Sequence, residues 1–165
     1  MKISIIGTGY VGLVSGVCLA YKGHKVICVD LKKEIKKNLN LGIPHIHEND
    51  LKKHLDDVIE RGLFEASTNL NYALDNSDIV LLAVGTPSEN GKIDLSQIEM
   101  VSKQIGNYIK NNSKFLSIIV KSTVVPGTTD NFVKNIIENE SGKKLGDYGI
   151  GMNPEFLREG DAMND

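Results

Sequence analysis

The first dozen residues constrain the fold most strongly, because an apolar run leads there directly into three closely spaced glycines. Residues 2–6 read Lys-Ile-Ser-Ile-Ile, which is typical of a buried strand, and glycines follow at positions 7, 9 and 12. We expect Gly7 to make a sharp turn, Gly9 to let a ligand approach the backbone, and Gly12 to let a helix lie close to the strand. The free amides at the start of that helix would suit a pyrophosphate group.

The sequence that follows supports a dinucleotide-binding turn, which a glycine pattern alone would not establish. Such a turn needs a second strand that ends in an acid about twenty residues after the last glycine. Residues 25–29 form an apolar run that leads to Asp30, 18 positions after Gly12. A carboxylate there can accept both hydroxyls of an adenosine ribose and would repel a 2′-phosphate. We therefore predict NAD rather than NADP as the ligand; a structural turn beside a surface aspartate is the alternative.

Strand-like and helix-like segments alternate along the chain. Four further expected strands are residues 64–67, 78–84, 115–121 and 148–152. Expected helices cover residues 11–21, 31–41, 50–61, 69–76, 95–110 and 129–139. This pattern predicts an α/β fold, a doubly wound, mostly parallel, Rossmann-like sheet with helices on both faces and strand order 3-2-1-4-5-6. A chain of 165 residues is expected to form one NAD-binding domain from residue 1 to residue 165.

Composition and charge narrow the class of protein. The net charge of −2 gives no electrostatic reason to expect nucleic-acid or membrane binding. No apolar stretch is long enough to span a bilayer, and the first strand begins too early for a secretory signal. Cys18 and Cys28 lie in apolar segments and are expected to fill core rather than form a disulfide. These features favour a cytoplasmic protein. His45 and His47 lack a third ligand at suitable spacing, so no metal site is predicted.

Polar residues follow several expected strands at their carboxyl ends, where open parallel sheets bind ligands. Thr86 and Thr123 come after two neighbouring strands, and their hydroxyls could bind ribose, carboxamide or a substrate water. A threonine at such a position more often serves a turn or a cap. Residues 153–160 follow the last strand, and the charged group Glu155, Arg158 and Glu159 within them is expected to contact the substrate. A solvated tail is the alternative.

Taken together, these motifs resemble the N-terminal NAD-binding domain of the UDP-glucose/GDP-mannose dehydrogenase family. The matching segments are residues 2–13, 29–30, 84–87, 121–128 and 153–160, which span nearly the whole chain. The family oxidises the C6 alcohol of a nucleotide sugar to a carboxylate in two NAD-dependent steps. The resemblance therefore implies NAD as cofactor and a nucleotide sugar as substrate.

The resemblance also implies roles for individual residues. The implied cofactor-binding residues are Gly7, Gly9, Tyr10, Val11, Gly12, Asp30, Thr86, Thr123 and Glu159. The implied substrate-binding residues are Glu155, Phe156, Leu157, Arg158 and Glu159. Thr123 and Glu155 would assist catalysis by holding the water or proton-transfer network at the reacting carbon.

Two positions depart from the family pattern. The family usually has a basic residue five positions after the acid of the second strand, where this chain has Ile35. Lys33 or Lys36 is expected to replace it beside the adenosine. The family's Glu-Pro-Gly-Leu reads Glu-Asn-Asp-Leu at residues 48–51 here.

The family's nucleophilic cysteine, with the lysine and asparagine that assist it, lies in a central helix and second domain that this chain does not include. Cys18 and Cys28 are poor replacements, because a nucleophile needs an exposed and activated thiolate. We therefore expect these 165 residues to bind NAD without completing the oxidation. The expected reaction of the parent protein, a homodimer, is oxidation of UDP-glucose to UDP-glucuronate. GDP-mannose or another nucleotide sugar is the alternative substrate, and a stand-alone NAD-sensing module is the alternative function.

Overall fold

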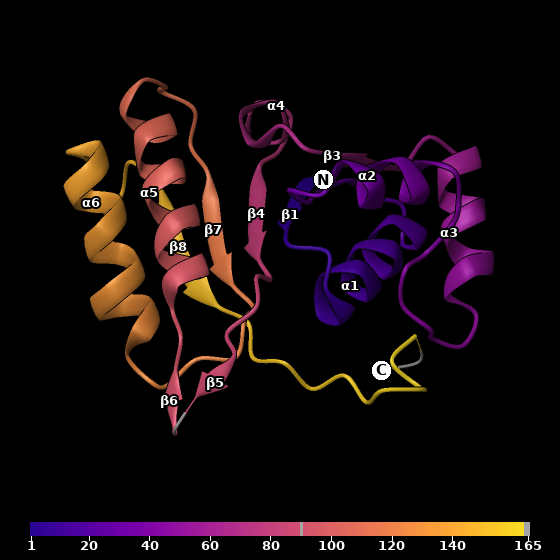
Figure 1. Ribbon diagram of the computed structural model, residues 1–165. Helices are drawn as coiled ribbons and strands as arrows, with labels where there is room; N and C mark the ends of the chain where they lie inside the picture. The colour runs from indigo at the N-terminus through magenta and orange to yellow at the C-terminus, as the bar shows by residue number, and fades with distance from the viewer. Residues whose placement is uncertain (90, 164–165) are drawn as a thin grey trace.

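The computed structural model describes residues 1–89 and 91–163, and within them six parallel strands form one sheet (Figure 1). The strands are β1 (Lys2–Ile6), β2 (Lys25–Val29), β3 (Phe64–Ser67), β4 (Ile79–Leu82), β7 (Ser117–Val120) and β8 (Gly149–Met152). Their order across the sheet is β3-β2-β1-β4-β7-β8. Because β7 and β8 are the fifth and sixth strands of this sheet along the chain, the predicted order 3-2-1-4-5-6 is confirmed.

Helices cover both faces of the sheet (Figure 1). One face carries α1 (Tyr10–Tyr21), α2 (Lys33–Asn40) and α3 (Leu51–Glu60), and the other carries α4 (Leu70–Asp75), α5 (Ser96–Lys110) and α6 (Lys134–Ser141). Side chains alternate along a strand. Accordingly, Ile5 packs with the cluster under α1 and α3, and Ile6 with the cluster under α5 and α6. The predicted doubly wound, Rossmann-like α/β fold is confirmed.

The strand register brings the carboxyl ends of the strands to one edge. Ile6 ends β1 beside Val29 of β2 and Leu82 of β4. Leu82 in turn lies beside Val120 of β7, which lies beside Met152 of β8. The segments that follow these strands therefore emerge next to one another, although they are far apart in the sequence.

The turn between β1 and α1 has the geometry that its glycines predict. Gly7 has φ of +101°, a conformation that residues with a side chain rarely adopt. A Cβ at Gly12 would lie 2.0 Å from the carbonyl oxygen of Gly7 and 3.2 Å from the Cβ of Ala83. Gly9 precedes the helix as its N-cap, and a Cβ there would meet open space. The close packing of α1 against the sheet thus depends on Gly12.

Two segments differ from the prediction. The helix predicted for residues 129–139 begins as a π-helix, η1 (Thr128–Val133), and continues as α6. A short hairpin of β5 (Ser88–Glu89) and β6 (Lys92–Ile93) occupies the loop after β4, where no strand was expected. A six-residue segment cannot reveal a π-helix by its apolar spacing, and a two-residue strand shows no alternation. Neither difference moves the carboxyl edge.

After β8 the chain crosses the carboxyl edge as an extended segment and reaches α1 (Figure 1). We call residues 153–163 the strap. Leu157, Ala162 and Met163 of the strap pack against the apolar cluster under α1 and α3, where Ala162 is only 1% exposed. The strap therefore runs from β8, an edge strand of the sheet, to α1 and the loop before α3.

Replacing Gly12 with alanine should destabilise the fold. The new Cβ would press on a backbone carbonyl, and overpacking of this kind typically costs roughly 1–3 kcal/mol. That cost exceeds the gain of about 1 kcal/mol in helix propensity. We expect a net loss in the free energy of unfolding by urea. Gly9→Ser is the control: serine suits an N-cap and has open space there, so its stability should match the wild type within about 0.5 kcal/mol. Equal stability of the two variants would contradict the packing role of Gly12.

Candidate functional site

The structure brings most of the predicted cofactor-binding residues to one cleft at the carboxyl edge. The first turn of α1 contributes one wall, and the loops after β4 and β7 contribute the other. The lining includes Gly7, Thr8, Gly9, Tyr10, Val11, Asp30, Gly85, Thr86, Lys121, Ser122 and Thr123. Gly12 is buried behind this wall, where it sets the packing of α1.

The start of α1 is open to a ligand. Its N-cap is Gly9, which offers no side chain to cap the first amides, and the first turn carries no acidic residue. Uncapped amides at the positive end of a helix dipole favour an anion. The observed turn therefore fits the diphosphate of a dinucleotide, which requires close approach to the backbone and no competing carboxylate.

Asp30 is held in a fixed orientation at the end of β2. The hydroxyl of Thr8 donates to one carboxylate oxygen at 2.5 Å, and the amide of Lys32 donates to the other at 2.9 Å. Each oxygen keeps a lone pair for a further donor. A second hollow extends from Asp30 between α4 and α5, and its lining includes Val29, Leu31, Lys32, Asn69 and Tyr108. This arrangement fits an adenosine whose ribose meets the acid.

Lys32 contacts Asp30 through its backbone amide, and a place for Lys33 or Lys36 beside the adenosine stays a prediction. Lys32 lines the same hollow as Asp30, whereas Lys33 and Lys36 line a separate one. Ile35, at the position where the family has a basic residue, packs against the apolar cluster of α1 and α3. Lys32 is the N-cap of α2, which starts at Lys33, and the sequence spacing did not give this starting point.

Thr86 and Thr123 meet across the gap between β4 and β7. The hydroxyl of Thr86 donates to the backbone carbonyl of Thr123 at 2.7 Å. The buried hydroxyl of Ser122 donates to the carbonyl of Val84 at 2.7 Å and so ties the same two loops together. Both threonines line the cleft, and the Thr123 residue is exposed.

Glu155 is connected to the cleft by an ion pair with a basic residue of the cleft lining, which the sequence analysis did not single out. The Nζ of Lys121, which lines the cleft, is 3.0 Å from Oε2 of Glu155 and donates to Oδ1 of Asn153 at 2.9 Å. Oε1 of Glu155 accepts the amide of Leu157 at 2.6 Å. The side chains of Lys121 and Glu155 are only 12% and 14% exposed. The pair thus fixes the Glu155 carboxylate at the edge of the site.

The other predicted substrate-binding residues lie on the strap and are not part of the cleft lining. Phe156 is 81% exposed, and Glu159 is also exposed. Leu157 packs inward against the apolar cluster, and Arg158 pairs with Asp161 at 3.0 Å. Tyr10 connects the two sets of residues, because its hydroxyl lies 3.5 Å from the carbonyl of Arg158.

Sequence reasoning missed two residues of the loop before α3. A ring nitrogen of His45 lies 2.8 Å from the carbonyl of Thr8, so this loop touches the glycine-rich turn. Glu48 is buried, and its carboxylate accepts the hydroxyl of Tyr10 together with the strap amides of Gly160 and Ala162. The only sequence signal for Glu48 was its place at the start of a family motif that otherwise departs in this chain.

The contact between Tyr10 and Glu48 shifts the pKa of both groups. Burial, together with the hydrogen bond to Glu48, raises the pKa of Tyr10 to about 12. The Tyr10 hydrogen bond lowers the pKa of the Glu48 carboxyl below its usual value, with further lowering from the amides of Gly160 and Ala162 and partial opposition from burial. Glu48 is therefore an anion, and Tyr10 a neutral donor, across the physiological pH range.

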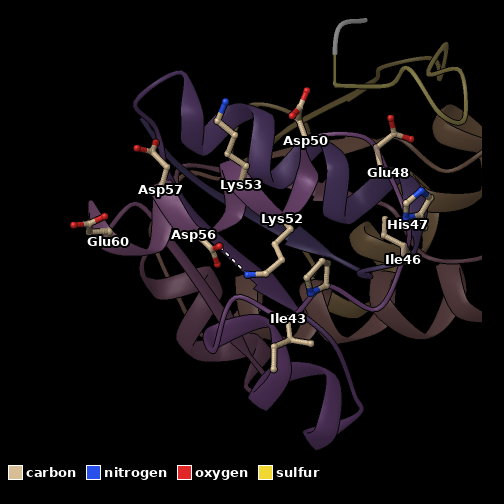
Figure 2. Close-up of a pocket in the computed structure, with 11 residues that line it drawn as sticks. Ile43, Ile46, His47, Glu48, Asp50, Lys52, Lys53, Asp56, Asp57 and Glu60 are labelled. Atoms are coloured by element: carbon tan, nitrogen blue, oxygen red, sulfur yellow. Dashed lines mark hydrogen bonds and ion pairs between the residues drawn. The ribbon is translucent and has the colours of Figure 1, made fainter.

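A further hollow lies on the outer side of α3 and contains none of the predicted site residues (Figure 2). Charges of both signs line it, and Lys52 pairs with Asp56 one turn further along α3 at 2.7 Å. In the described part of the chain, no group of three or more His, Cys, Asp or Glu side chains is arranged to hold a metal ion. Among those residues there is also no helix with the length and apolar character needed to cross a membrane.

Comparison with known proteins agrees with this geometry. A family model described as the NAD binding domain of the UDP-glucose/GDP-mannose dehydrogenase family matches residues 1–165. The chain belongs to this family. It is an NAD-binding domain of the nucleotide-sugar dehydrogenases, which are oxidoreductases, and the predicted cofactor is confirmed at that level.

Relatives with two different substrate names resemble the chain to a similar degree. GDP-mannose 6-dehydrogenase of Pseudomonas aeruginosa is 44% identical over 167 residues, and UDP-glucose 6-dehydrogenase of Haloferax volcanii is 40% identical over 170 residues. Each match covers 100% of this chain but only 38% of the relative. The chain thus spans less than two fifths of the length of these relatives.

Solved structures of the family share the fold closely. The chain matches a ternary complex of GDP-mannose dehydrogenase from P. aeruginosa with a TM-score of 0.97 and 44% identity, covering 100% of this chain and 38% of that one. It matches a UDP-glucose dehydrogenase from Pyrobaculum islandicum with a TM-score of 0.91 and 35% identity, covering 99% of this chain and 38% of that one.

The Glu48 carboxylate should make stability depend on pH in the acid range. Its pKa in the folded protein is lower than in the unfolded chain, so the unfolded chain binds more protons as the pH falls. The stabilisation is present in full above the unfolded pKa and is lost as the pH falls through the folded value. We expect the difference in unfolding free energy between the wild type and Glu48→Gln to be constant from pH 6 to 8 and to shrink below about pH 4.5. Urea denaturation at several pH values would measure it; a difference that grows on acidification would contradict the assignment.

Proposed function

We propose that the chain binds NAD along the carboxyl edge, with the diphosphate at the first turn of α1 and the adenosine ribose at Asp30. The nicotinamide half would then lie toward Thr86 and Thr123. The observation that carries this proposal is the combination, in one cleft, of uncapped helix amides at Gly9 with a carboxylate held by Thr8 and Lys32. Tyr10, Val11 and the other predicted cofactor-binding residues of the cleft act as its walls.

We further propose that the parent protein oxidises a nucleotide sugar and that the strap supplies part of its sugar site. NAD, when bound, supplies the hydride acceptor. Glu155 and Thr123 would hold a water or a proton at the reacting carbon, and Lys121 would keep the Glu155 carboxylate oriented. Residues 156–159 would contact the nucleotide sugar, and Glu159 would also lie near the cofactor.

Two nucleotide sugars, UDP-glucose and GDP-mannose, are the candidate substrates of the parent protein. UDP-glucose follows from the sequence motifs and is supported by a relative of 40% identity. GDP-mannose is supported to a similar degree by a relative of 44% identity. Family membership favours the domain of an enzyme over a stand-alone NAD-sensing module. A homodimeric parent stays a prediction.

Neither cysteine of the chain is suited to act as the thiol nucleophile. Burial raises the pKa of Cys28, which is fully enclosed at β2, and burial also raises the pKa of the half-buried Cys18. A thiol with a raised pKa is a poor nucleophile at neutral pH. We propose that these 165 residues hold the cofactor and need further residues of the parent protein for catalysis.

Asp30→Asn should weaken NAD binding. The amide has one acceptor oxygen in place of two and carries no charge, so the ribose hydroxyls lose a charged acceptor that is worth about 1.5–3 kcal/mol. We expect a rise of at least about tenfold in the Kd for NAD, measured by isothermal titration calorimetry. The wild type should bind NAD more tightly than NADP, and the variant should narrow that preference.

Asp57→Asn, on the outer side of α3, is the matched control and should leave both affinities unchanged. Tighter binding of NADP than NAD by the wild type would refute the role of Asp30.

The chain should form no NADH from NAD and either nucleotide sugar. Its thiols are buried or half-buried with raised pKa values and are poor nucleophiles, and the strap supplies only part of the proposed sugar site, so neither oxidation step should proceed. The measurement is absorbance at the NADH band with UDP-glucose and, separately, with GDP-mannose. The P. aeruginosa GDP-mannose 6-dehydrogenase serves as the positive control. Turnover by the 165-residue chain at rates near those of that enzyme would overturn the proposal.

A further inference from the structure

A buried carboxylate outside the predicted site joins the strap to the first turn of α1. Glu48 is only 6% exposed, although it lies in the loop that precedes α3. Its Oε2 accepts the hydroxyl of Tyr10 and, at 2.8 Å, the amide of Gly160. Its Oε1 accepts the amide of Ala162 at 3.2 Å. Three segments separated by about 40 to 150 residues therefore meet at one side chain.

Among the described residues, the hydrogen-bond donors to the Glu48 carboxylate are all neutral. A buried carboxylate is stable only where hydrogen bonds replace its lost water, so the strap amides and the Tyr10 hydroxyl stabilise the anion in place of a cation. The backbone of Gly160 has φ of +90°, which a residue with a side chain rarely adopts. The strap backbone therefore has a positive φ at this position, which glycine adopts without steric cost.

The two ends of this contact belong to the two halves of the site. Tyr10 lines the cofactor cleft next to Gly9 and Val11. Gly160 directly follows residues 155–159, the predicted sugar-binding segment of the strap. The neighbouring Asn49 adds a hydrogen bond from its side-chain amide to the carbonyl of Gly160 at 2.6 Å. The loop before α3 therefore contacts both halves.

We propose that Glu48 is a positioning residue that holds the strap against the first turn of α1 and so keeps residues 155–159 beside the NAD cleft. The proposal rests on the proposed function for the identity of the two halves. It assigns a role to a residue that lies in neither the glycine-rich turn nor the strap.

Amide hydrogen exchange, measured by NMR on the chain without NAD, tests the contact directly. In Glu48→Gln, an NH₂ group that can only donate replaces one of the two carboxylate oxygens. Gly160 and Ala162 donate to different oxygens, so at least one of these strap amides loses its acceptor. We expect exchange at Gly160 or Ala162 to accelerate at least tenfold, while exchange in β1 and β4 changes less than twofold. Asp50→Asn is the matched control. It removes an exposed carboxylate two residues away that caps nothing, and asparagine tolerates the positive φ there.

A double-mutant cycle on NAD affinity tests whether Glu48 acts through Tyr10. We expect Glu48→Gln and Tyr10→Phe each to raise the Kd for NAD about fivefold, and the double variant to raise it no further than about tenfold. If the two residues acted independently, the two fivefold increases in Kd would multiply to about 25-fold. A general loss of stability would not produce a smaller increase in the double variant.

Unchanged exchange at both strap amides in Glu48→Gln, or multiplicative effects in the cycle, would overturn the proposal. If Glu48→Gln does not fold, Gly160→Ala tests the contact from the strap, with faster exchange at Ala162 expected and an unchanged rate contradicting it. Failure of the wild-type chain to bind NAD would instead overturn the proposed function, and the exchange comparison would still decide the role of Glu48.

Discussion

The close approach of α1 to the ends of β1 and β4 governs the geometry of the carboxyl edge. Gly12 faces the Gly7 carbonyl and the side chain of Ala83 with no room for a Cβ. Because the helix starts so near the strand end, its uncapped first turn forms one wall of the cleft and Asp30 lies within reach of Thr8. If a methyl group at position 12 pushed α1 outward, the distances from its first amides to Asp30 and to the loops after β4 and β7 would change.

The carboxylates at this edge are each held by donors from other segments. Asp30 accepts hydrogen bonds from Thr8 and Lys32. Glu155 accepts one from the amide of Leu157 and forms an ion pair with Lys121. Side chains that are already ordered need little rearrangement when a ligand binds, which lowers the entropic cost of binding. The same logic extends to Glu48, whose partners lie in the cofactor wall and in the strap. The edge is therefore organised before the cofactor is present.

Family membership and the chemistry of the chain point to a division of labour. The chain contains the cofactor cleft and a strap with charged residues, while its two thiols are buried or half-buried and have raised pKa values. It spans 38% of the length of its relatives. If NAD is held as proposed, through backbone amides and a ribose acid, these contacts do not depend on which nucleotide sugar is bound. This agrees with the nearly equal resemblance to relatives named for GDP-mannose and for UDP-glucose.

The sequence by itself determined the sheet order, the glycine turn with its acid at Asp30, and the gathering of Thr86 and Thr123 at one edge. These follow from local periodicity and from the rule that parallel strands align their carboxyl ends. Only the tertiary structure decided that the backbone amide of Lys32 contacts Asp30, that Lys121 holds Glu155, and that Glu48 joins Tyr10 to the strap. The first contact depends on where α2 begins. The others depend on the path of the segment after β8, and Glu48 and Gly160 are 112 residues apart in the sequence. Residue spacing does not give the path of the strap, because that path depends on the packing of its apolar side chains against the cluster under α1 and α3.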